Sequence, residues 1–407
     1  MSASHSSHSS LSDLTPPGPA RISSQLRGVF GLLVLVGIAS FVLTLFKDPE
    51  SAWSSFLIGH FYFLSLALGG VFFAVIQWVT GAMWSAPVRR LFESFAAYLP
   101  IALITTVILC LGLGVLYHWT HAEVVQGDII LEGKEGYLNI PFFIIRNVGA
   151  LLVLGFLAWK LIGHSIAQDT DKNYAHTLAN RRLGPVFLVL FALLYSFSAV
   201  DQLMSLDPHW FSTMFGVYAF AGLFYSMLAM TCLLTLAFKE RQLKDFINDN
   251  HIHDIGKFMF AFTVFWAYIG FSQFMLIWYA NLPEETGYFI RRMSGGWWYV
   301  SLFLLIGKFM VPFFALLPRG AKRNPTRLKA VAIWMLFAQL VDLVWVVQPE
   351  LYSEGPNLTI MGLVSLLGTF AGFAGLFGLA VAWFLGKFSL VAMGDPRLEE
   401  SVFHHHQ

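Results

Sequence analysis

Ten apolar stretches, each long enough to cross a membrane as a helix, dominate this chain of 407 residues. They cover about residues 29–46, 54–80, 94–117, 140–166, 184–203, 210–238, 256–281, 297–317, 328–348 and 358–386. An α-helix rises about 1.5 Å per residue, so about twenty residues cross an apolar layer of about 30 Å. Only 12% of the residues are charged, whereas a soluble domain carries about 25%. The sequence therefore predicts an all-α polytopic membrane protein.

The loops between these stretches differ in their content of basic residues. Of the 25 Lys and Arg residues, 18 lie in loops on the side of the two termini, whereas the opposite loops hold only Lys47, Lys134, Arg291 and Arg292. By the positive-inside rule, both termini are expected in the cytoplasm. Residues 1–28 are rich in Ser, His and Pro and lack the apolar core of a signal peptide. We expect them to form a disordered cytoplasmic tail, and residues 391–407 to form a second cytoplasmic tail.

Two segments at the ends of spans five and nine resemble each other. They read VDQLMSLDPHWF (200–211) and VDLVWVVQPELY (341–352), and in each a proline follows the aspartate by seven residues. The offset of 141 residues covers four helices, so both copies would have the same orientation in the membrane. The pattern predicts a transmembrane domain of residues 29–390 that contains two parallel-repeat four-helix bundles, 54–209 and 210–350, and two flanking helices.

Ionisable side chains inside apolar spans mark candidate sites, because a charge in the bilayer is costly. In the first bundle such groups gather near the outer side of the membrane: His60, His118, His121, Arg146 and Asp201. A quinone head group there would need hydrogen-bond donors for its carbonyls and an acceptor for its protons. These residues are quinone-pocket candidates. The alternative is a structural ion pair between Arg146 and Asp201, with histidines that only form local hydrogen bonds.

Metal and haem sites have weaker support. His60 with His118 or His121 could bind the two faces of a haem b iron, but no second matched pair of histidines lies nearer the cytoplasm. The two cysteines, Cys110 and Cys232, are too few for an iron–sulfur cluster, which takes about four thiolates. No C-x-x-C-H motif for covalent haem attachment occurs. We expect no metal and no covalently bound cofactor. The net charge of +1 gives no reason to expect nucleic-acid binding.

A second set of polar groups lies in the other bundle and toward the cytoplasm. Asp342 is predicted in the outer half of span nine, and Lys308, near mid-depth in span eight, is long enough to approach it. A buried pair of this kind suits a proton relay and a structural ion pair equally well. The amides of Gln273 and Gln339 lie at neighbouring levels. Polar groups of the first bundle continue this set toward the cytoplasm. The proton-path candidates are therefore Asp342, Lys308, Gln273, Gln339, Asp201, His60, Lys160 and His164. Several tyrosines could connect them: Tyr62, Tyr195, Tyr218, Tyr225 and Tyr268.

The stretch VDQLMSLDPHWFSTMFGVYAFAG (200–222) resembles a signature of the NrfD/PsrC-like membrane proteins. Within that group it is most similar to the second quinone-binding-type membrane subunit of alternative complex III, the ActF type. The number of spans and the absence of cofactor motifs agree with the resemblance, which covers most of residues 25–390. It implies a subunit of a bacterial inner-membrane complex that oxidises a quinol, menaquinol or ubiquinol, and passes electrons to a periplasmic cytochrome c or a terminal oxidase.

The resemblance also implies the partners of the chain. A paralogous NrfD-like subunit, a multihaem cytochrome c and iron–sulfur subunits would hold the working quinol site and the redox centres. The chain itself would be structural, surrounded by lipids, with a quinone pocket near His60, Arg146 and Asp201 and a proton path near Asp342 and Lys308. Two other functions fit the pattern of spans: a secondary transporter and a structural scaffold. Pro312 breaks span eight without a counterpart in span four, which disfavours the transporter.

Overall fold

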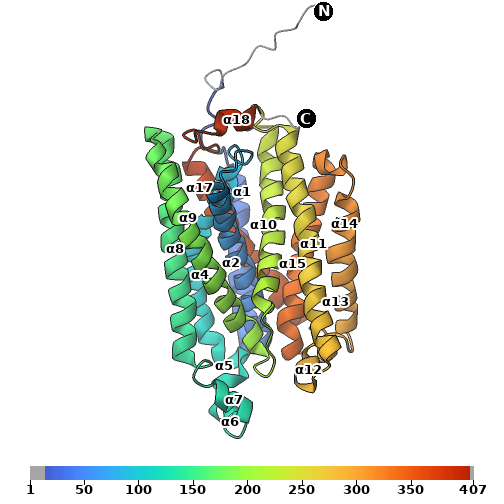
Figure 1. Cartoon of the computed structure of the whole chain (residues 1–407). Coiled ribbons are helices and arrows are strands. Elements are labelled where there is room, and N and C mark those ends of the chain that lie inside the picture. The colour runs from blue at the N-terminus through green and yellow to red at the C-terminus, as the bar shows by residue number, and fades with distance from the viewer. Residues whose placement is uncertain (1–13, 404–407) are drawn as a thin grey trace, which may run out of the picture.

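The structure, a computed structural model, describes residues 14–403 and is built from helices (Figure 1). Within these described residues, ten helical segments are long and apolar enough to cross a membrane. They are α1 (Ser24–Lys47), α2 (Pro49–Thr80), α3 to α5 (Arg89–Leu116), α8 (Ile140–Asp171), α9 (Tyr174–Gln202), α10 (Phe215–Lys239), α11 (Asp249–Ala280), α13 to α14 (Trp297–Leu316), α15 (Pro325–Val347) and α16 to α17 (Ile360–Lys387). The prediction of an all-α polytopic fold is confirmed.

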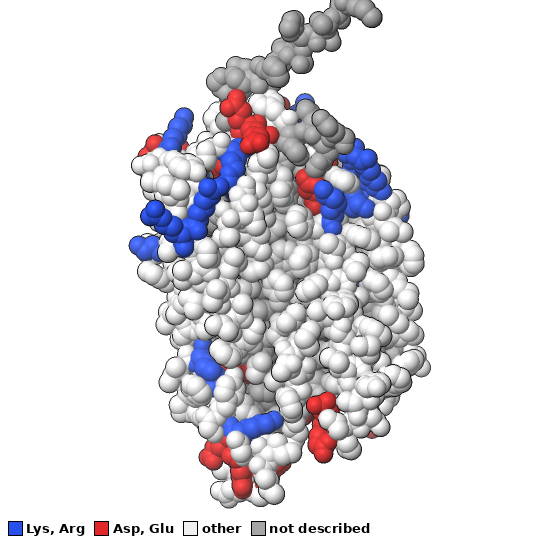
Figure 2. Space-filling view, in the orientation of Figure 1, with Lys and Arg blue, Asp and Glu red and all other residues white. Residues whose placement is uncertain are grey.

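Four short helices lie outside the spans. They are α6 (Ala122–Val125), α7 (Ile129–Lys134), α12 (Pro283–Arg292) and α18 (Leu398–Val402). Helices α6, α7 and α12 lie at one end of the molecule, and α18 lies at the other, where α1 begins and α17 ends (Figure 1). Lys and Arg gather at the α18 end, above a wide uncharged belt (Figure 2). We call this end the basic end and the other the opposite end.

Polar caps set the boundaries of the spans. A single residue, Asp48, separates α1 from α2, and its side chain accepts a hydrogen bond of 3.0 Å from the amide of Ser51. Pro49 follows as the first residue of α2, where a missing N–H costs nothing. Helix α11 begins with a capping box, in which Asn248 and His251 exchange side-chain and backbone hydrogen bonds. These local signals end each apolar run where the chain has to turn.

The spans pack as two quartets and a pair. In the first quartet α2, α4, α8 and α9 contact one another in a ring; in the second quartet α10, α11, α14 and α15 do the same. The pair, α1 and α17, packs along α2. Helix α2 is the centre of the molecule, since it also contacts α10 and α15 of the second quartet. The sequence repeat between the two quartets stays a prediction.

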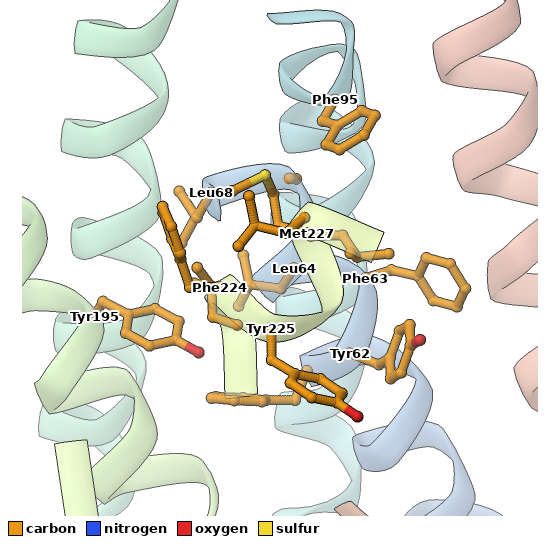
Figure 3. Close-up of a cluster of buried hydrophobic side chains, with 14 of the residues drawn as sticks. Tyr62, Phe63, Leu64, Leu68, Phe95, Tyr195, Phe224, Tyr225 and Met227 are labelled. Carbon is orange, nitrogen blue, oxygen red and sulfur yellow. The ribbon is translucent and has the colours of Figure 1, made fainter. Parts of the chain in front are cut away.

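An apolar core joins the two quartets across α2 and α10. In Figure 3, Leu64 and Leu68 of α2 lie against Phe224 and Met227 of α10. Each of these four side chains is buried. Burying such a side chain contributes about 1.5–3 kcal/mol relative to leaving it exposed. The contact therefore fixes how the first quartet sits on the second, and with it the site between them.

The described parts of the predicted tails are ordered by contacts. The backbone of Pro19 pairs with Ser389, and the amide of Ala20 donates to Leu385 O at 2.7 Å. Residues 24–28 already belong to α1, whereas the sequence predicted a disordered tail that extends to residue 28. Helix α18 buries Leu398 within the predicted C-terminal tail. Residues 1–13 and 404–407 of the two predicted tails lie outside the described residues.

Arg89 and Arg90 differ from the sequence prediction, which treated them as loop residues. Both are buried in α3 beside Glu93, which no solvent reaches. Arg90 Nη1 lies 2.7 Å from Glu93 Oε2, and Arg90 Nη2 lies 2.6 Å from Asp169 Oδ2. Arg89 pairs with Asp395 as well as with Glu93. Burial would raise the pKa of Asp395, but Arg89 and the amide of Arg397 hold it below its ordinary value. This network fastens the C-terminal segment to the first quartet.

Close contact between two glycines holds α1 against α17. A Cβ added to Gly372 would lie 2.7 Å from Gly37 Cα, so neither position has room for a side chain. Helix α1 is largely unburied elsewhere, since only 11% of its apolar window is buried. We expect Gly372→Leu to destabilise the protein by about 1–3 kcal/mol because it pushes α1 away. Gly149→Leu is the control, since nothing lies within 4 Å of that position. Thermal unfolding in detergent measures both; equal midpoints would contradict the prediction.

Candidate functional site

The segment 200–211 joins the two quartets at the opposite end of the molecule. Asp201, at the end of α9, pairs with Arg146 of α8. Asp207 pairs with Arg291 of α12, and His209 Nε2 lies 2.6 Å from Asp128 Oδ2 in the loop before α7. Each of the three side chains thus bonds to a different element. Of these three residues, the sequence singled out only Asp201 as a site candidate; the partners of Asp207 and His209 come from α12 and from the loop before α7.

The Arg146–Asp201 pair has the two-pronged geometry of a strong ion pair. Arg146 Nε lies 2.8 Å from Asp201 Oδ2, and Nη2 lies 2.9 Å from Oδ1. Asn147 donates a further hydrogen bond of 3.1 Å to the carboxylate. Arg146 Nη1 donates to Tyr137 O, and the guanidinium stacks 3.8 Å from the Tyr137 ring. Most donors of Arg146 are therefore occupied by groups of this chain.

The three histidines of the predicted quinone pocket are divided between two places. His60 is fully buried, and its ring lies 2.8 Å from Thr105 Oγ1 and 3.4 Å from Thr106 Oγ1. His118 and His121 are exposed and line a cavity of about 550 Å³ at the opposite end, together with Asp48 and Glu50. No described residue belongs to a group of three His, Cys, Asp or Glu side chains placed to hold a metal ion.

Lys308 and Asp342 form a buried ion pair in the second quartet. Lys308 Nζ lies 2.7 Å from Asp342 Oδ2 and 2.7 Å from Gln339 Oε1. The side chain of Lys308 is 0% exposed and that of Asp342 is 2% exposed. The hydroxyl of Tyr218 donates to the other carboxylate oxygen, and the ring of Trp266 lies 4.2 Å from Lys308 Nζ. The charges are thus balanced inside a shell of polar and aromatic groups.

The local backbone explains why Lys308 can face this site. Pro312 lacks an N–H and cannot bond to the carbonyl four residues before it, which is that of Lys308. Residues 304–310 adopt a π-helix, a wider turn that often occurs at functional sites. The Lys308 carbonyl accepts from Tyr225 Oη at 3.1 Å, and the neighbouring carbonyl of Gly307 accepts from Trp334 Nε1 at 2.6 Å. Side chains of α10 and α15 therefore compensate for the interrupted helix.

A small cavity continues the site toward the first quartet. It has a volume of about 10 Å³ and is lined by Asp342, Gln339, Tyr218 and Ser65, among others. This is roughly the space that one water molecule needs. Ser65 of α2 in turn bonds to Tyr195 of α9 at 2.9 Å. Polar groups therefore extend from Lys308 through the cavity to α9.

The other proton-path candidates lie apart from this group. Gln273 is buried, and its Nε2 has no hydrogen-bond partner among the described residues. Lys160 is exposed, with Nζ 5.0 Å from the Trp159 ring, and His164 lies 3.0 Å from His176 at the basic end. Tyr268 is 64% exposed. In the described part of the chain, no hydrogen bond or ion pair joins these residues to Lys308 or Asp342.

Two polar features were not singled out by the sequence. One is the direct contact of Tyr218 with Asp342, which the sequence offered only as one of five tyrosines. The other is Arg292, which is 1% exposed and reaches Glu350 at 3.1 Å and the carbonyls of Trp345 and Val346. Its guanidinium lies 3.4 Å from the centre of the Tyr288 ring. Burial raises the pKa of Tyr288 to about 12, so this ring stays neutral.

Fold and site together define a class: a polytopic, all-α membrane protein whose two quartets each contain a buried basic–acidic pair between their third and fourth spans. Comparison with known proteins does not narrow this class. Neither the scan against protein-family models nor the search of curated proteins finds a match for this chain.

Proposed function

We propose that this chain is a membrane subunit of a respiratory quinol oxidoreductase complex, similar to the NrfD/PsrC-like ActF type of alternative complex III. In this proposal it has no redox centre of its own and conducts protons through the site at Lys308 and Asp342. The haems and iron–sulfur clusters belong to partner subunits, and the substrate of the complex is menaquinol or ubiquinol. In this proposal the membrane is the bacterial inner membrane, and the excess of Lys and Arg at the basic end supports a cytoplasmic position of that end.

The Lys308–Asp342 pair is the observation on which this function depends. A buried ion pair alone is weak support, because many such pairs are structural. Here, however, Asp342 borders a cavity of about one water, and Tyr218, Gln339 and Ser65 line the same cavity. A proton that reaches Asp342 from this water would neutralise the carboxylate and weaken its hold on Lys308, which could then release a proton in turn. Hydroxyl and amide groups at hydrogen-bond distance suit such a transfer.

The first quartet supports a different role for its own pair. Arg146 and Asp201 meet through two hydrogen bonds, and Asn147 supplies a third to the carboxylate. A carboxylate bonded in this way has few sites left for an arriving proton. We therefore propose that this pair stabilises the fold. A purely structural scaffold is the second candidate function, and it predicts that the Lys308–Asp342 pair does the same.

The experiment removes the two charges of each pair together, so that no charge stays buried alone. We expect Lys308→Gln with Asp342→Asn to keep quinol oxidation in the purified complex but to lower proton translocation into vesicles by about ten-fold or more. The matched control, Arg146→Gln with Asp201→Asn, should keep its proton translocation where the complex assembles. A pH-sensitive dye inside the vesicles and the rate of quinol oxidation are measured on the same sample.

Two results would contradict the proposal. Undiminished proton translocation in the Lys308→Gln, Asp342→Asn variant would leave the pair with a structural role only. Purification of the native chain without haem- or iron–sulfur-containing subunits, as identified by mass spectrometry, would contradict the role in a redox complex.

A further inference from the structure

An apolar groove of about 650 Å³ lies between the α1–α17 pair and the two quartets. Its walls come from α1, α2, α10, α15 and α17, and include Phe30, Phe337, Phe370 and Leu234. Along α10 it extends from Met230 to Phe238, which corresponds to about 12 Å of helix, and it continues past the end of α10 to Arg241. The helical part is somewhat less than half of an apolar membrane core of about 30 Å. The groove therefore lies in one leaflet, that of the basic end.

Two arginines stand at the mouth of the groove. Arg21 and Arg241 line it and are exposed. No hydrogen bond or ion pair of either guanidinium occurs within residues 14–403. A basic residue at this end of a span contacts the head-group layer of the membrane. The two guanidiniums are thus available to a ligand that enters from that layer.

Backbone contacts keep the two arginines close together. The amide of Arg21 donates to Gln242 Oε1 at 3.0 Å, so Arg21 is tied to the residue next to Arg241. Gln242 Nε2 donates in turn to Pro19 O at 3.0 Å. The amide of Leu390, which follows α17, donates to Gly18 O at 2.9 Å. The backbone at the mouth of the groove is therefore held in place, and the side chains of Arg21 and Arg241 start from neighbouring points on it.

We propose that this groove binds an anionic phospholipid of the leaflet at the basic end. The phosphate would lie between Arg21 and Arg241, since guanidinium groups bind phosphate oxygens through paired hydrogen bonds. An acyl chain would lie along the aromatic walls toward Tyr62, which lines the groove and whose hydroxyl donates to Leu336 O at 2.9 Å. An uncharged isoprenoid tail would fill the same apolar space but would give neither arginine a partner.

A second groove of the same size provides a comparison. It measures about 640 Å³ and lies between α8, α17 and the segment formed by η2 (Ser94–Tyr98) and α4 (Leu99–Leu109). Leu103, Trp159 and Trp383 are among its lining residues. No charged side chain lines it. We therefore expect this second groove to accept lipids without regard to the charge of the head group.

Native mass spectrometry of the detergent-purified protein tests the proposal. Phosphatidylglycerol and phosphatidylcholine with the same acyl chains are added in equal amounts. We expect wild type to retain phosphatidylglycerol about ten-fold more tightly, and Arg21→Gln with Arg241→Gln to lose this preference. Arg319→Gln with Lys329→Gln removes two exposed charges of the same end outside the groove and should leave it unchanged.

Variants that fill each groove separate the two sites. Ala374→Trp should lower the retention of phosphatidylglycerol, whereas Leu103→Trp in the second groove should preserve the head-group preference. Equal retention of the two lipids by wild type would overturn the proposal. So would a quinone that is retained in place of phospholipid and is lost in Ala374→Trp but not in Arg21→Gln with Arg241→Gln. If Ala374→Trp does not fold, the two charge variants decide the question alone. None of these results depends on proton transfer.

Discussion

Lys308→Met is expected to lower the free energy of unfolding by about 3–5 kcal/mol, because it leaves the carboxylate of Asp342 buried without its counter-ion. Asp342 is 2% exposed and would keep only the hydroxyl of Tyr218 as a donor. Methionine fills a volume close to that of lysine, so the loss would reflect the charge more than the packing. Gln339, which accepts from Lys308 at 2.7 Å, would lose its partner as well.

The double variant Lys308→Met with Asp342→Asn is expected to recover most of this loss. Once both charges are gone, no buried charge stays uncompensated, and replacing a buried ion pair by neutral groups is often nearly neutral in stability. The two single changes should therefore be strongly non-additive, as for any two residues in direct contact. Unfolding by denaturant in a single detergent, followed by tryptophan fluorescence, gives the full double-mutant cycle. A single variant as stable as wild type would show that Asp342 has another partner or is reached by water.

The pairing of Lys308 with Asp342 could be predicted from the sequence, whereas the direct contact of Tyr218 with Asp342 could not. Residue counts from the span ends place Asp342 in the outer half of its span and Lys308 near mid-depth, within reach of its long side chain, because each helical residue adds a constant rise. The direction of a side chain around the helix axis also depends on local winding. Pro312 and the π-helix at 304–310 change that winding next to Lys308. An apolar span, moreover, gives little indication of which face meets another helix.

Other features depend on contacts that the sequence does not record. From the sequence alone, Arg89 and Arg90 are expected in a loop. In the structure both are buried, and Glu93, Asp169 and Asp395 balance their charges. His60 was grouped with His118 and His121 by depth, but its ring faces Thr105 and Thr106. The apolar groove could not be predicted from the sequence, because it is the space left between the side chains of five helices. Side-chain geometry, not pattern, decides each of these cases.

Arg291 and Arg292 are the most direct example, and they lead to the second large effect. They are adjacent in α12 and equivalent in the sequence, yet Arg292 is 1% exposed and Arg291 is 39% exposed. Arg291 uses a single nitrogen, Nη2, for both Asp207 and Glu350. Arg292 uses all three nitrogens of its guanidinium group. Nε donates to Trp345 O, Nη2 donates to Val346 O, and Nη1 donates to Glu350 and to Tyr288 O.

Arg292→Lys is therefore expected to destabilise the protein by about 2–4 kcal/mol, and Arg291→Lys by less than about 1 kcal/mol. An ammonium group can replace one nitrogen that contacts two carboxylates. It cannot reach the four acceptors of Arg292, and it loses the stacking on Tyr288 at 3.4 Å. The carbonyls of Trp345 and Val346 at the end of α15 would then stay buried without a donor, at a position where a helix favours a cation.

Thermal unfolding of the two variants in the same detergent measures this difference directly. The substitution, the helix and the change in volume are the same, so the difference reports only the contacts of each guanidinium. Equal destabilisation at the two positions would mean that charge, rather than the geometry of the guanidinium, holds α12 to the end of α15. Since Arg291 and Arg292 share Glu350, a cycle of single and double variants then shows whether that carboxylate couples them.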